Sequence, residues 1–278
     1  MNLFVSEKEA LANAQKTLDG LAPYHCPIYI FDEKGVPQQI GTSVLIDVFG
    51  HKFLVSAAHV YDETHNRDLC ITFRNKFIPL RGDIIESNSN GNRGSDRIDL
   101  ALLEVSEDFE AYLADYKAVS FDSIDYNHIC SSLHDYMVVG FPASKNGLRY
   151  GTNSVKRKIY GYAGKMADAG VFDKMFISPM SHVIVNFRKN KLMSLDKNFV
   201  TFPDPYGISG GGIWLIENIS FNRRLKIREP KLVAIGIEWK KHHKCLLGVG
   251  VATIIEMLKT HTNIIPIQGI VTNLICVS

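Results

Sequence analysis

Residues 42–59 read TSVLIDVFGHKFLVSAAH, which is two apolar runs with a short turn between them. The runs at 42–48 and 53–57 are rich in the β-branched and aromatic side chains that strands favour. Phe49-Gly50 between them is typical of a two-residue hairpin turn. The segment therefore predicts a β-hairpin whose second strand runs into Ala57-Ala58-His59.

Short apolar runs of the same kind recur along most of the chain. They lie between turn-forming residues, at 27–31, 69–73, 100–105, 136–139, 182–187, 212–216, 232–237 and 246–251. Many short strands with few helical patterns predict an all-β fold of the sandwich or barrel type. At this length, two antiparallel barrels are more plausible than one.

A helix is expected at each end of this series of strands. Ser6 with Glu9, and Thr253 with Glu256, have the spacing of capping boxes, which begin helices. The expected layout has four parts. They are an N-terminal helix at 1–23, a first barrel at 24–120, a second barrel with the C-terminal helix at 121–262, and a tail at 263–278.

The composition is that of a globular protein. Of 278 residues, 46% are hydrophobic and 22% are charged, which excludes disorder over most of the length. A formal net charge of only +2 argues against a dedicated nucleic-acid binder. The sequence has no apolar run long enough to span a membrane, no signal-peptide pattern at its start, and no cysteine spacing typical of disulfides or metal sites. We therefore expect a cytoplasmic protein with reduced thiols.

Three short motifs carry the chemistry. His59 ends a strand, Asp99 opens the apolar run Leu100-Ala101-Leu102-Leu103, and Ser209 lies in Gly207-Ile208-Ser209-Gly210-Gly211. Each motif alone has an ordinary structural explanation: a hydrogen-bonded histidine, a turn carboxylate, a flexible loop. Together, in this order and each beside an expected strand, they favour nucleophilic catalysis. A serine hydroxyl is a weak nucleophile unless an adjacent imidazole takes its proton.

The three motifs resemble those of the trypsin-like (chymotrypsin-fold) serine proteases of the bacterial intracellular type. That family has Ala-Ala-His at a strand end, then Asp-apolar-Ala-apolar, then Gly-x-Ser-Gly-Gly, and the similarity covers about residues 26–261. The resemblance implies two antiparallel six-stranded β-barrels with the active site in the cleft between them. It also implies that His59 acts as base and acid, that Asp99 orients it, and that Ser209 attacks. The backbone N–H groups of Gly207 and Ser209 would form the oxyanion hole.

The sequence departs from the family pattern beside the serine. Ile208 stands where the digestive members carry an aspartate that pairs with the N-terminus released by zymogen cleavage, so activation by that route is not expected. The position of trypsin's acidic specificity residue is Pro203 here. The residues that we expect to line or border the substrate pocket are Asp204, Tyr206, Glu238, Trp239 and Gly248.

Several basic clusters have a simpler interpretation than nucleic-acid or metal binding. They lie at 156–158, 188–191, 223–224 and 240–244, and acids elsewhere in the chain balance them. His242 and His243 are adjacent, so a strand would point them to opposite faces, and no metal site is predicted. We interpret all four clusters as solvated surface.

The sequence therefore predicts an intracellular serine endopeptidase that hydrolyses protein or peptide substrates through an acyl-enzyme. No cofactor, membrane or nucleic acid is implied, and control by an activating partner protein is compatible with Ile208. The alternative is a catalytically silent, protease-like binding module, although the intact set of His59, Asp99 and Ser209 argues against it. A module that binds nucleic acid through the basic loops is a more distant third.

Overall fold

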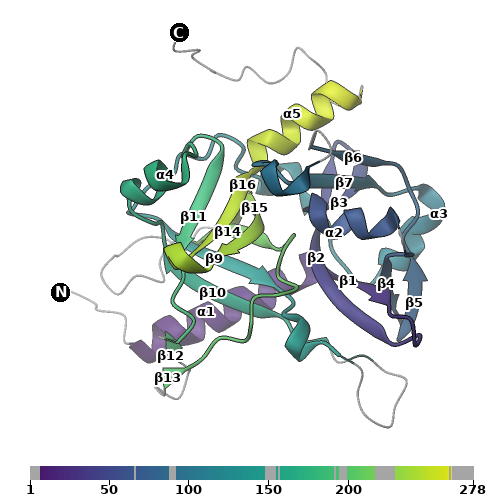
Figure 1. The fold of residues 1–278 in the computed structure, drawn as a ribbon, viewed down its shortest axis with the longest axis horizontal. Coiled ribbons are helices and arrows are strands. Elements are labelled where there is room, and N and C mark those ends of the chain that lie inside the picture. The colour runs from purple at the N-terminus through teal and green to yellow at the C-terminus, as the bar shows by residue number, and fades with distance from the viewer. Residues whose placement is uncertain are drawn as a thin grey trace.

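The chain forms two largely antiparallel β-sheets that lie side by side, with helices at their periphery (Figure 1). The computed structural model describes residues 7–65, 67–87, 92–147, 155, 157–190, 192–193, 199–216, 229–262 and 264. Helix α1 (Glu7–Leu21) contacts β10 of the second sheet. Helix α5 (Val251–His261) packs on β15 and β16 of that sheet and on β6 of the first, so it ties the two halves together.

The predicted hairpin is confirmed and lies at the centre of the first sheet. Strand β2 (Pro37–Val48) pairs with β3 (His51–Ala57), and Val48 faces His51 across the turn. Phe49 and Gly50 both have positive φ, 53° and 90°. Two consecutive residues of this conformation match the right-handed twist of the paired strands, which is why the turn needs only two residues.

The first sheet has eight strands in the order β5-β4-β1-β2-β3-β7-β6, with β8 paired in parallel to β2. Its remaining strands are β1 (His25–Phe31), β4 (Cys70–Phe73), β5 (Lys76–Pro79), β6 (Ile84–Glu86), β7 (Leu100–Glu104) and β8 (Val119–Ser120). Two short helices lie within this half. They are α2 (Ala58–Tyr61) and α3 (Glu107–Glu110).

The second sheet has six strands in the order β10-β9-β14-β15-β16-β11. They are β9 (Asp135–Gly140), β10 (Tyr160–Lys165), β11 (His182–Asn186), β14 (Gly212–Ile216), β15 (Lys231–Lys240) and β16 (Cys245–Gly250), and helix α4 (Ala169–Met175) precedes β11. A separate pair is formed by β12 (Leu192–Met193) and β13 (Phe199–Val200). The all-β class is confirmed. Closure of both sheets into six-stranded barrels stays a prediction.

One local expectation is wrong, and strands β5, β6, β8, β10, β12 and β13 were not expected. Helix α5 begins at Val251 with Gly250 as its N-cap, so Thr253 lies inside the helix; β16 passes directly into the helix and needs no capping box between them. Strand β10 was not expected, because its sequence YGYAGK carries two glycines, which weaken strand propensity. Leu18 of α1 lies where a side chain at Gly161 would be. The N-terminal helix is confirmed, but Ser6 lies outside the described residues.

One cluster of buried apolar residues spans both sheets, and a second lies within the second sheet. Trp214 of β14 is the largest fully buried side chain, and its ring lies 5.6 Å from that of Tyr24. Cys26, Cys70, Cys130 and Cys245 are free thiols, whereas Cys276 lies outside the described residues. Across the described ranges, no helix is both long and apolar enough to cross a membrane.

A buried histidine joins the end of α1 to the second sheet. His25 is 1% exposed; its Nδ1 lies 2.9 Å from Leu21 O, and its Nε2 accepts hydrogen bonds from Gly212 N–H and Trp214 Nε1–H. These contacts require a neutral ring protonated on Nδ1. Burial lowers the pKa of His25 to about 4, against the smaller opposing effect of the Leu21 carbonyl.

We therefore expect the protein to lose stability as pH falls from about 6.5 to about 4. In that interval the unfolded chain binds a proton that the folded chain cannot, so the free energy of unfolding drops, by about 3 kcal/mol from this group. Urea denaturation across the interval measures the change. The His25→Gln variant removes the titrating ring, so its stability should depend less on pH. An identical slope in the two proteins would contradict the assignment.

Candidate active site

His59 and Asp99 are brought together by the pairing of the strands that carry them. Strand β3 ends at Ala57, which faces Leu100 at the start of β7. His59 lies two residues after Ala57 and Asp99 lies one residue before Leu100, so this strand pair places them side by side. Ala58 N donates to Asp99 O at 2.8 Å, and His59 N donates to Asp99 Oδ1 at 2.9 Å. The second carboxylate oxygen, Oδ2, lies 2.7 Å from His59 Nδ1.

This geometry fixes both the orientation and the tautomer of the imidazole. Asp99 accepts at both carboxylate oxygens, so Nδ1 of His59 carries the hydrogen and Nε2 keeps a free lone pair. The Asp99 side chain is 12% exposed and that of His59 is 42% exposed, so the ring faces solvent on the side away from its partner. Asp99 has a φ of 44°, a conformation that aspartate tolerates better than most residues.

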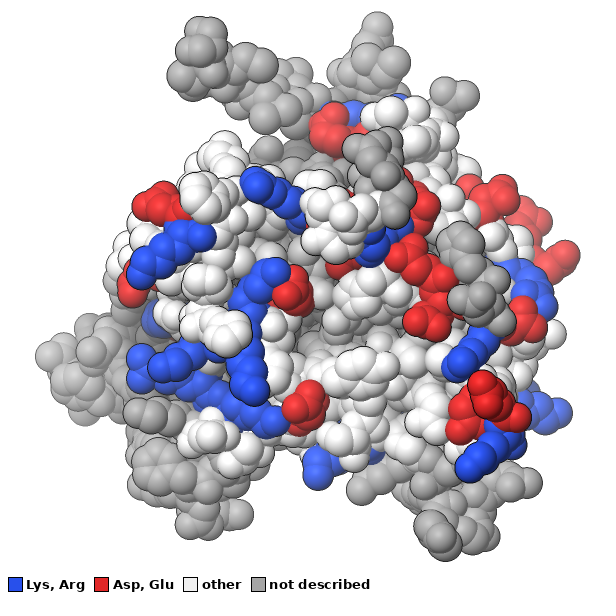
Figure 2. Space-filling model, viewed as in Figure 1, with Lys and Arg blue, Asp and Glu red and all other residues white. Residues whose placement is uncertain are grey.

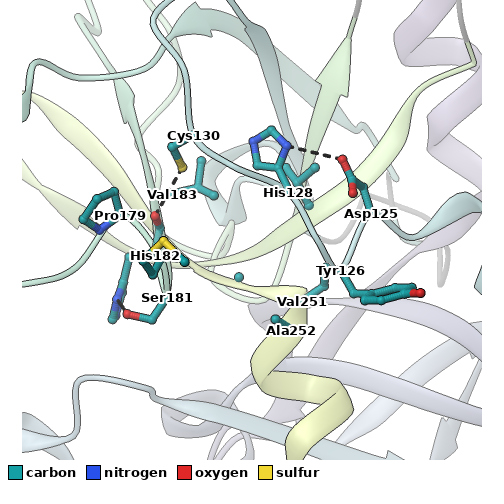
Figure 3. A pocket seen from close by; sticks show the side chains of 13 residues that line it. Asp125, Tyr126, His128, Cys130, Pro179, Ser181, His182, Val183, Val251 and Ala252 are labelled. Carbon is teal, nitrogen blue, oxygen red and sulfur yellow. Dashed lines mark hydrogen bonds and ion pairs between the residues drawn. The ribbon is translucent and has the colours of Figure 1, made fainter. Parts of the chain in front are cut away.

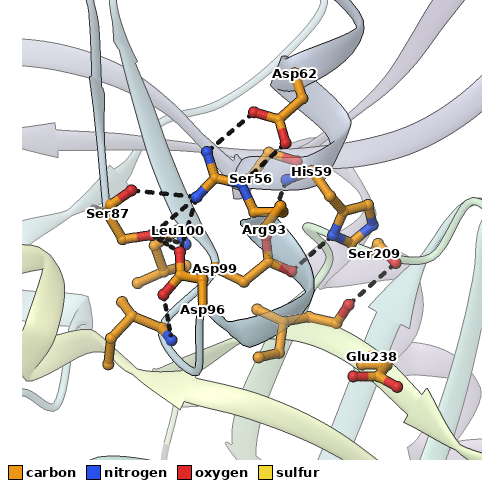
Figure 4. A network of polar contacts seen from close by, with 12 residues as sticks. Ser56, His59, Asp62, Ser87, Arg93, Asp96, Asp99, Leu100, Ser209 and Glu238 are labelled. Carbon is orange, nitrogen blue, oxygen red and sulfur yellow. Dashed lines mark hydrogen bonds and ion pairs between the residues drawn. The ribbon is translucent and has the colours of Figure 1, made fainter. Parts of the chain in front are cut away.

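An ion-pair network anchors the segment that carries Asp99. Arg93 lies before β7, and its guanidinium contacts the carboxylates of Asp62, Glu86 and Asp96 at 2.9, 2.8 and 2.8 Å. Asp62 follows directly on α2, so Arg93 links the chain after His59 to the chain before Asp99 (Figure 4). The hydrogen bonds that Arg93 donates to Asp62 are the main cause that raises the pKa of Arg93. No sequence pattern indicates this network, because its members have no regular spacing.

Ser209 is held against the hairpin of the first sheet. Its carbonyl oxygen accepts a hydrogen bond from Thr42 N at 2.8 Å. Gly210 follows with a φ of 86°, and a Cβ there would overlap Thr42 O and Ser56 Oγ. Only glycine allows this close approach. The Ser209 hydroxyl donates to Ile237 O at 3.3 Å, and in Figure 4 it lies on the side of the His59 ring away from Asp99.

The N–H groups of Gly207 and Ser209 donate to no acceptor within the part of the chain that the structure describes. Their directions are nevertheless fixed, because a trans peptide points its N–H opposite to its C=O. The carbonyl of Tyr206 accepts from Ala143 N at 2.8 Å, and that of Ile208 accepts from Gly211 N at 2.8 Å. The hydrogen bond to the carbonyl of each peptide therefore fixes the direction of the free N–H group of the same peptide.

Two side chains of β2 hold the next carbonyl of the same loop. Gly207 O accepts from Gln39 Nε2 at 3.0 Å and from Thr42 Oγ1 at 2.9 Å. Thr42 Oγ1 in turn accepts from Phe141 N at 3.0 Å. Ile208 is 5% exposed and belongs to the apolar cluster inside the second sheet. Burial of Ile208 therefore anchors the loop where the digestive members of the resembled family use a buried ion pair.

A small pocket lies beside Ser209. Its volume of about 20 Å³ is room for roughly one water molecule. Glu238 and Trp239 line it, but most of its wall is apolar and was not predicted: Val138, Pro205, Ile208, Leu246 and Leu247. A β-bulge between Gly236 and Glu238 shifts the register by one residue, so Glu238 faces Leu247 instead of Leu246.

The other expected pocket residues lie elsewhere. Gly248 is packed in the sheet, where a Cβ would meet Ile235 O at 2.8 Å. Tyr206 is 64% exposed. Asp204 pairs with Lys189 at 3.1 Å on the surface, and the Tyr206 backbone N–H is the main group that lowers the pKa of its carboxyl. None of these three lines the pocket beside Ser209.

A second polar cavity is unrelated to this site. It is lined by side chains that include Asp125, His128, Cys130 and His182, and its volume is also about 20 Å³ (Figure 3). Burial raises the pKa of Cys130 to about 11, so this thiol stays protonated and is a poor nucleophile. Within the described ranges, no group of three or more His, Cys, Asp or Glu residues is arranged to hold a metal ion.

Comparisons with known proteins bear on the fold. No protein-family model and no curated protein matches the sequence. Among solved structures, the Vibrio cholerae VesB protease superposes with a TM-score of 0.51 at 13% identity, over 87% of this chain. The chain spans 64% of the VesB chain. A structure from a study of the coupled folding and binding of the Sesbania mosaic virus VPg protein matches at a TM-score of 0.44 and 13% identity. The match covers 84% of this chain and 95% of the other chain, and it is too weak to bear on fold or function. The likeness to VesB supports a chymotrypsin-like fold.

Proposed function

We propose that this protein is a serine endopeptidase in which His59, Asp99 and Ser209 form a catalytic triad. The observation that carries the proposal is the combination of an oriented imidazole with the two free backbone N–H groups of Gly207 and Ser209. A binding module has no need of either feature. A peptide carbonyl placed between Ser209 Oγ and the two N–H groups meets a nucleophile, a base and two donors for a developing oxyanion.

The proposed reaction begins when the Ser209 hydroxyl rotates from Ile237 O to Nε2 of His59. His59 takes the proton as Oγ attacks the carbonyl carbon, and Asp99 stabilises the imidazolium through Nδ1. The N–H groups of Gly207 and Ser209 stabilise the oxyanion by about 3–4 kcal/mol each. The C–N bond then breaks, His59 protonates the leaving amine, and the acyl ester on Ser209 is hydrolysed by a water that His59 activates.

A regulated or silent site is the second candidate, and one observation favours it. The Ser209 hydroxyl donates to Ile237 O, so Ser209 and His59 have no hydrogen bond in this conformation. An activating partner protein, or the substrate itself, would then supply the energy for the rotation. A module that only binds would keep Ser209 in its present position even with peptide bound.

Peptide hydrolysis by the wild type and the Ser209→Ala and His59→Ala variants tests the proposal. We expect the wild type to cleave members of a mixed peptide pool and both variants to lose that activity. Unchanged cleavage by either variant would contradict the proposed triad. The same proposal keeps three expectations from the sequence: two six-stranded barrels, action inside the cell on protein or peptide substrates, and no cofactor.

The Thr42→Val variant tests how the loop is held. Valine has the shape of threonine but cannot donate to Gly207 O or accept from Phe141 N, so we expect kcat for peptide hydrolysis to fall about tenfold with a smaller change in KM. Thr72→Val is a matched control, because Thr72 is equally buried and its hydroxyl has no hydrogen-bond partner. Equal kcat in the two variants would show that Thr42 does not position the loop.

A further inference from the structure

A larger pocket also borders Trp239. Its volume is about 400 Å³, enough for a substrate side chain. Phe187 and Trp239 form aromatic walls, and their rings meet edge to face at 6.0 Å. Four cationic side chains surround these walls: Arg188, Lys189, Lys241 and Lys244.

The pocket has an excess of positive charge. Lys189 pairs with Asp204 at 3.1 Å, and its ammonium lies 5.6 Å from the centre of the Trp239 ring. In the described part of the chain, no carboxylate lies within ion-pair distance of Arg188, Lys241 or Lys244. Figure 2 shows Lys and Arg side chains gathered over this end of the second sheet, around the turn between β15 and β16.

The pocket is also close to the proposed reaction centre. Trp239 lines both this pocket and the small one beside Ser209. It follows Ile237, whose carbonyl accepts from the Ser209 hydroxyl, by two residues on the same strand. Two residues of a strand span about 7 Å. A peptide that presents a carbonyl to Ser209 therefore reaches the basic pocket within about two of its own residues.

We propose that this pocket binds the carboxylate of an aspartate or glutamate in the substrate, so that the enzyme selects acidic peptide segments. The proposal rests on the proposed peptidase function. Aromatic walls suit the methylene stem of an acidic side chain, and the cations at the rim suit its carboxylate. A carboxylate side chain alone matches this combination of aromatic walls and cations, so no phosphate-bearing or neutral ligand is proposed. This contrasts with the pocket beside Ser209, whose walls are mostly apolar and whose only charged lining residue, Glu238, pairs with Lys240.

Peptide binding to the Ser209→Ala protein tests the pocket independently of catalysis. The probes are fluorescent peptide pools with blocked termini that are identical except for Glu or Gln at one position at a time. We expect Glu to lower Kd about fivefold at one position near the cleavage centre, and added salt to remove the difference. Lys241→Glu and Lys244→Glu, each introduced into the Ser209→Ala protein, should abolish or reverse the preference.

Lys174→Glu is the matched control, because Lys174 is exposed on α4 and the substitution changes net charge equally. Equal Kd for the Glu and Gln pools at every position, undetectable binding of both, or the same loss of preference in the Lys174→Glu protein would overturn the pocket assignment. The two proposals fail separately. Selective binding of Glu pools without any wild-type hydrolysis would refute the peptidase and keep the pocket. Wild-type hydrolysis of peptides with no preference for Glu in binding would refute the pocket and keep the peptidase.

Discussion

Asp99→Asn is expected to lower kcat/KM for peptide hydrolysis about 10⁴-fold while the protein stays folded. An asparagine can still accept from His59 N–H through its carbonyl oxygen, but it places an NH₂ group where Asp99 Oδ2 meets Nδ1. A donor at that position forces the imidazole into the other tautomer, with its hydrogen on Nε2. That ring cannot take the proton of Ser209. Steady-state kinetics with a cleaved peptide measures the loss.

Asp125→Asn is the control for this prediction. Asp125 also pairs with a histidine, His128 Nδ1 at 3.4 Å, but it lies in the separate cavity of Figure 3. We expect that variant to keep wild-type activity at neutral pH. A similar loss of rate in the two variants would show that the effect of Asp99 comes from general destabilisation and not from the tautomer of His59.

Gly210→Ala is expected to destabilise the protein by more than about 3 kcal/mol and to abolish activity. A methyl group there overlaps a backbone oxygen, Thr42 O, as well as Ser56 Oγ, and neither is the free end of a flexible side chain. The loop must therefore move away from the hairpin, and Ser209 moves with it. Urea denaturation and peptide hydrolysis together measure the effect.

Gly35→Ala separates this overlap from backbone strain. Gly35 has a φ of 72°, close to the 86° of Gly210, but nothing lies within 4 Å of its absent Cβ. We expect it to cost only about 1 kcal/mol and to leave catalysis unchanged. Equal destabilisation by the two substitutions would mean that contact between the Ser209 loop and the hairpin contributes little.

Much of the fold follows from local signals. The hairpin turn at Phe49-Gly50 and most strands of both sheets come from patterns of a few residues, which sequence alone contains. The missed strand β10 contains Gly161, whose missing side chain leaves room for Leu18 of α1 and Met137 of β9, and the sequence of β10 alone does not show this packing. Likewise, the start of α5 is set by its direct continuation from β16, and the Thr253 spacing is accidental.

The candidate site divides in the same way. His59, Asp99 and Ser209 stand out because each sits at a strand end in a recognisable motif. Gln39 and Thr42 could not be found, since an ordinary strand residue becomes important only when the loop at 207–209 folds against it. Nor could the sequence show that Gly248 is packed within the sheet opposite Gly236, where a Cβ would meet Ile235 O.

Intact mass after incubation with a fluorophosphonate tests the central claim most directly, because the reagent labels only a serine that an adjacent base activates. The account predicts one adduct on the wild type and none on Ser209→Ala or His59→Ala. An adduct that persists in Ser209→Ala, or a wild type that takes none although peptide pools are cleaved, would contradict a triad built on Ser209.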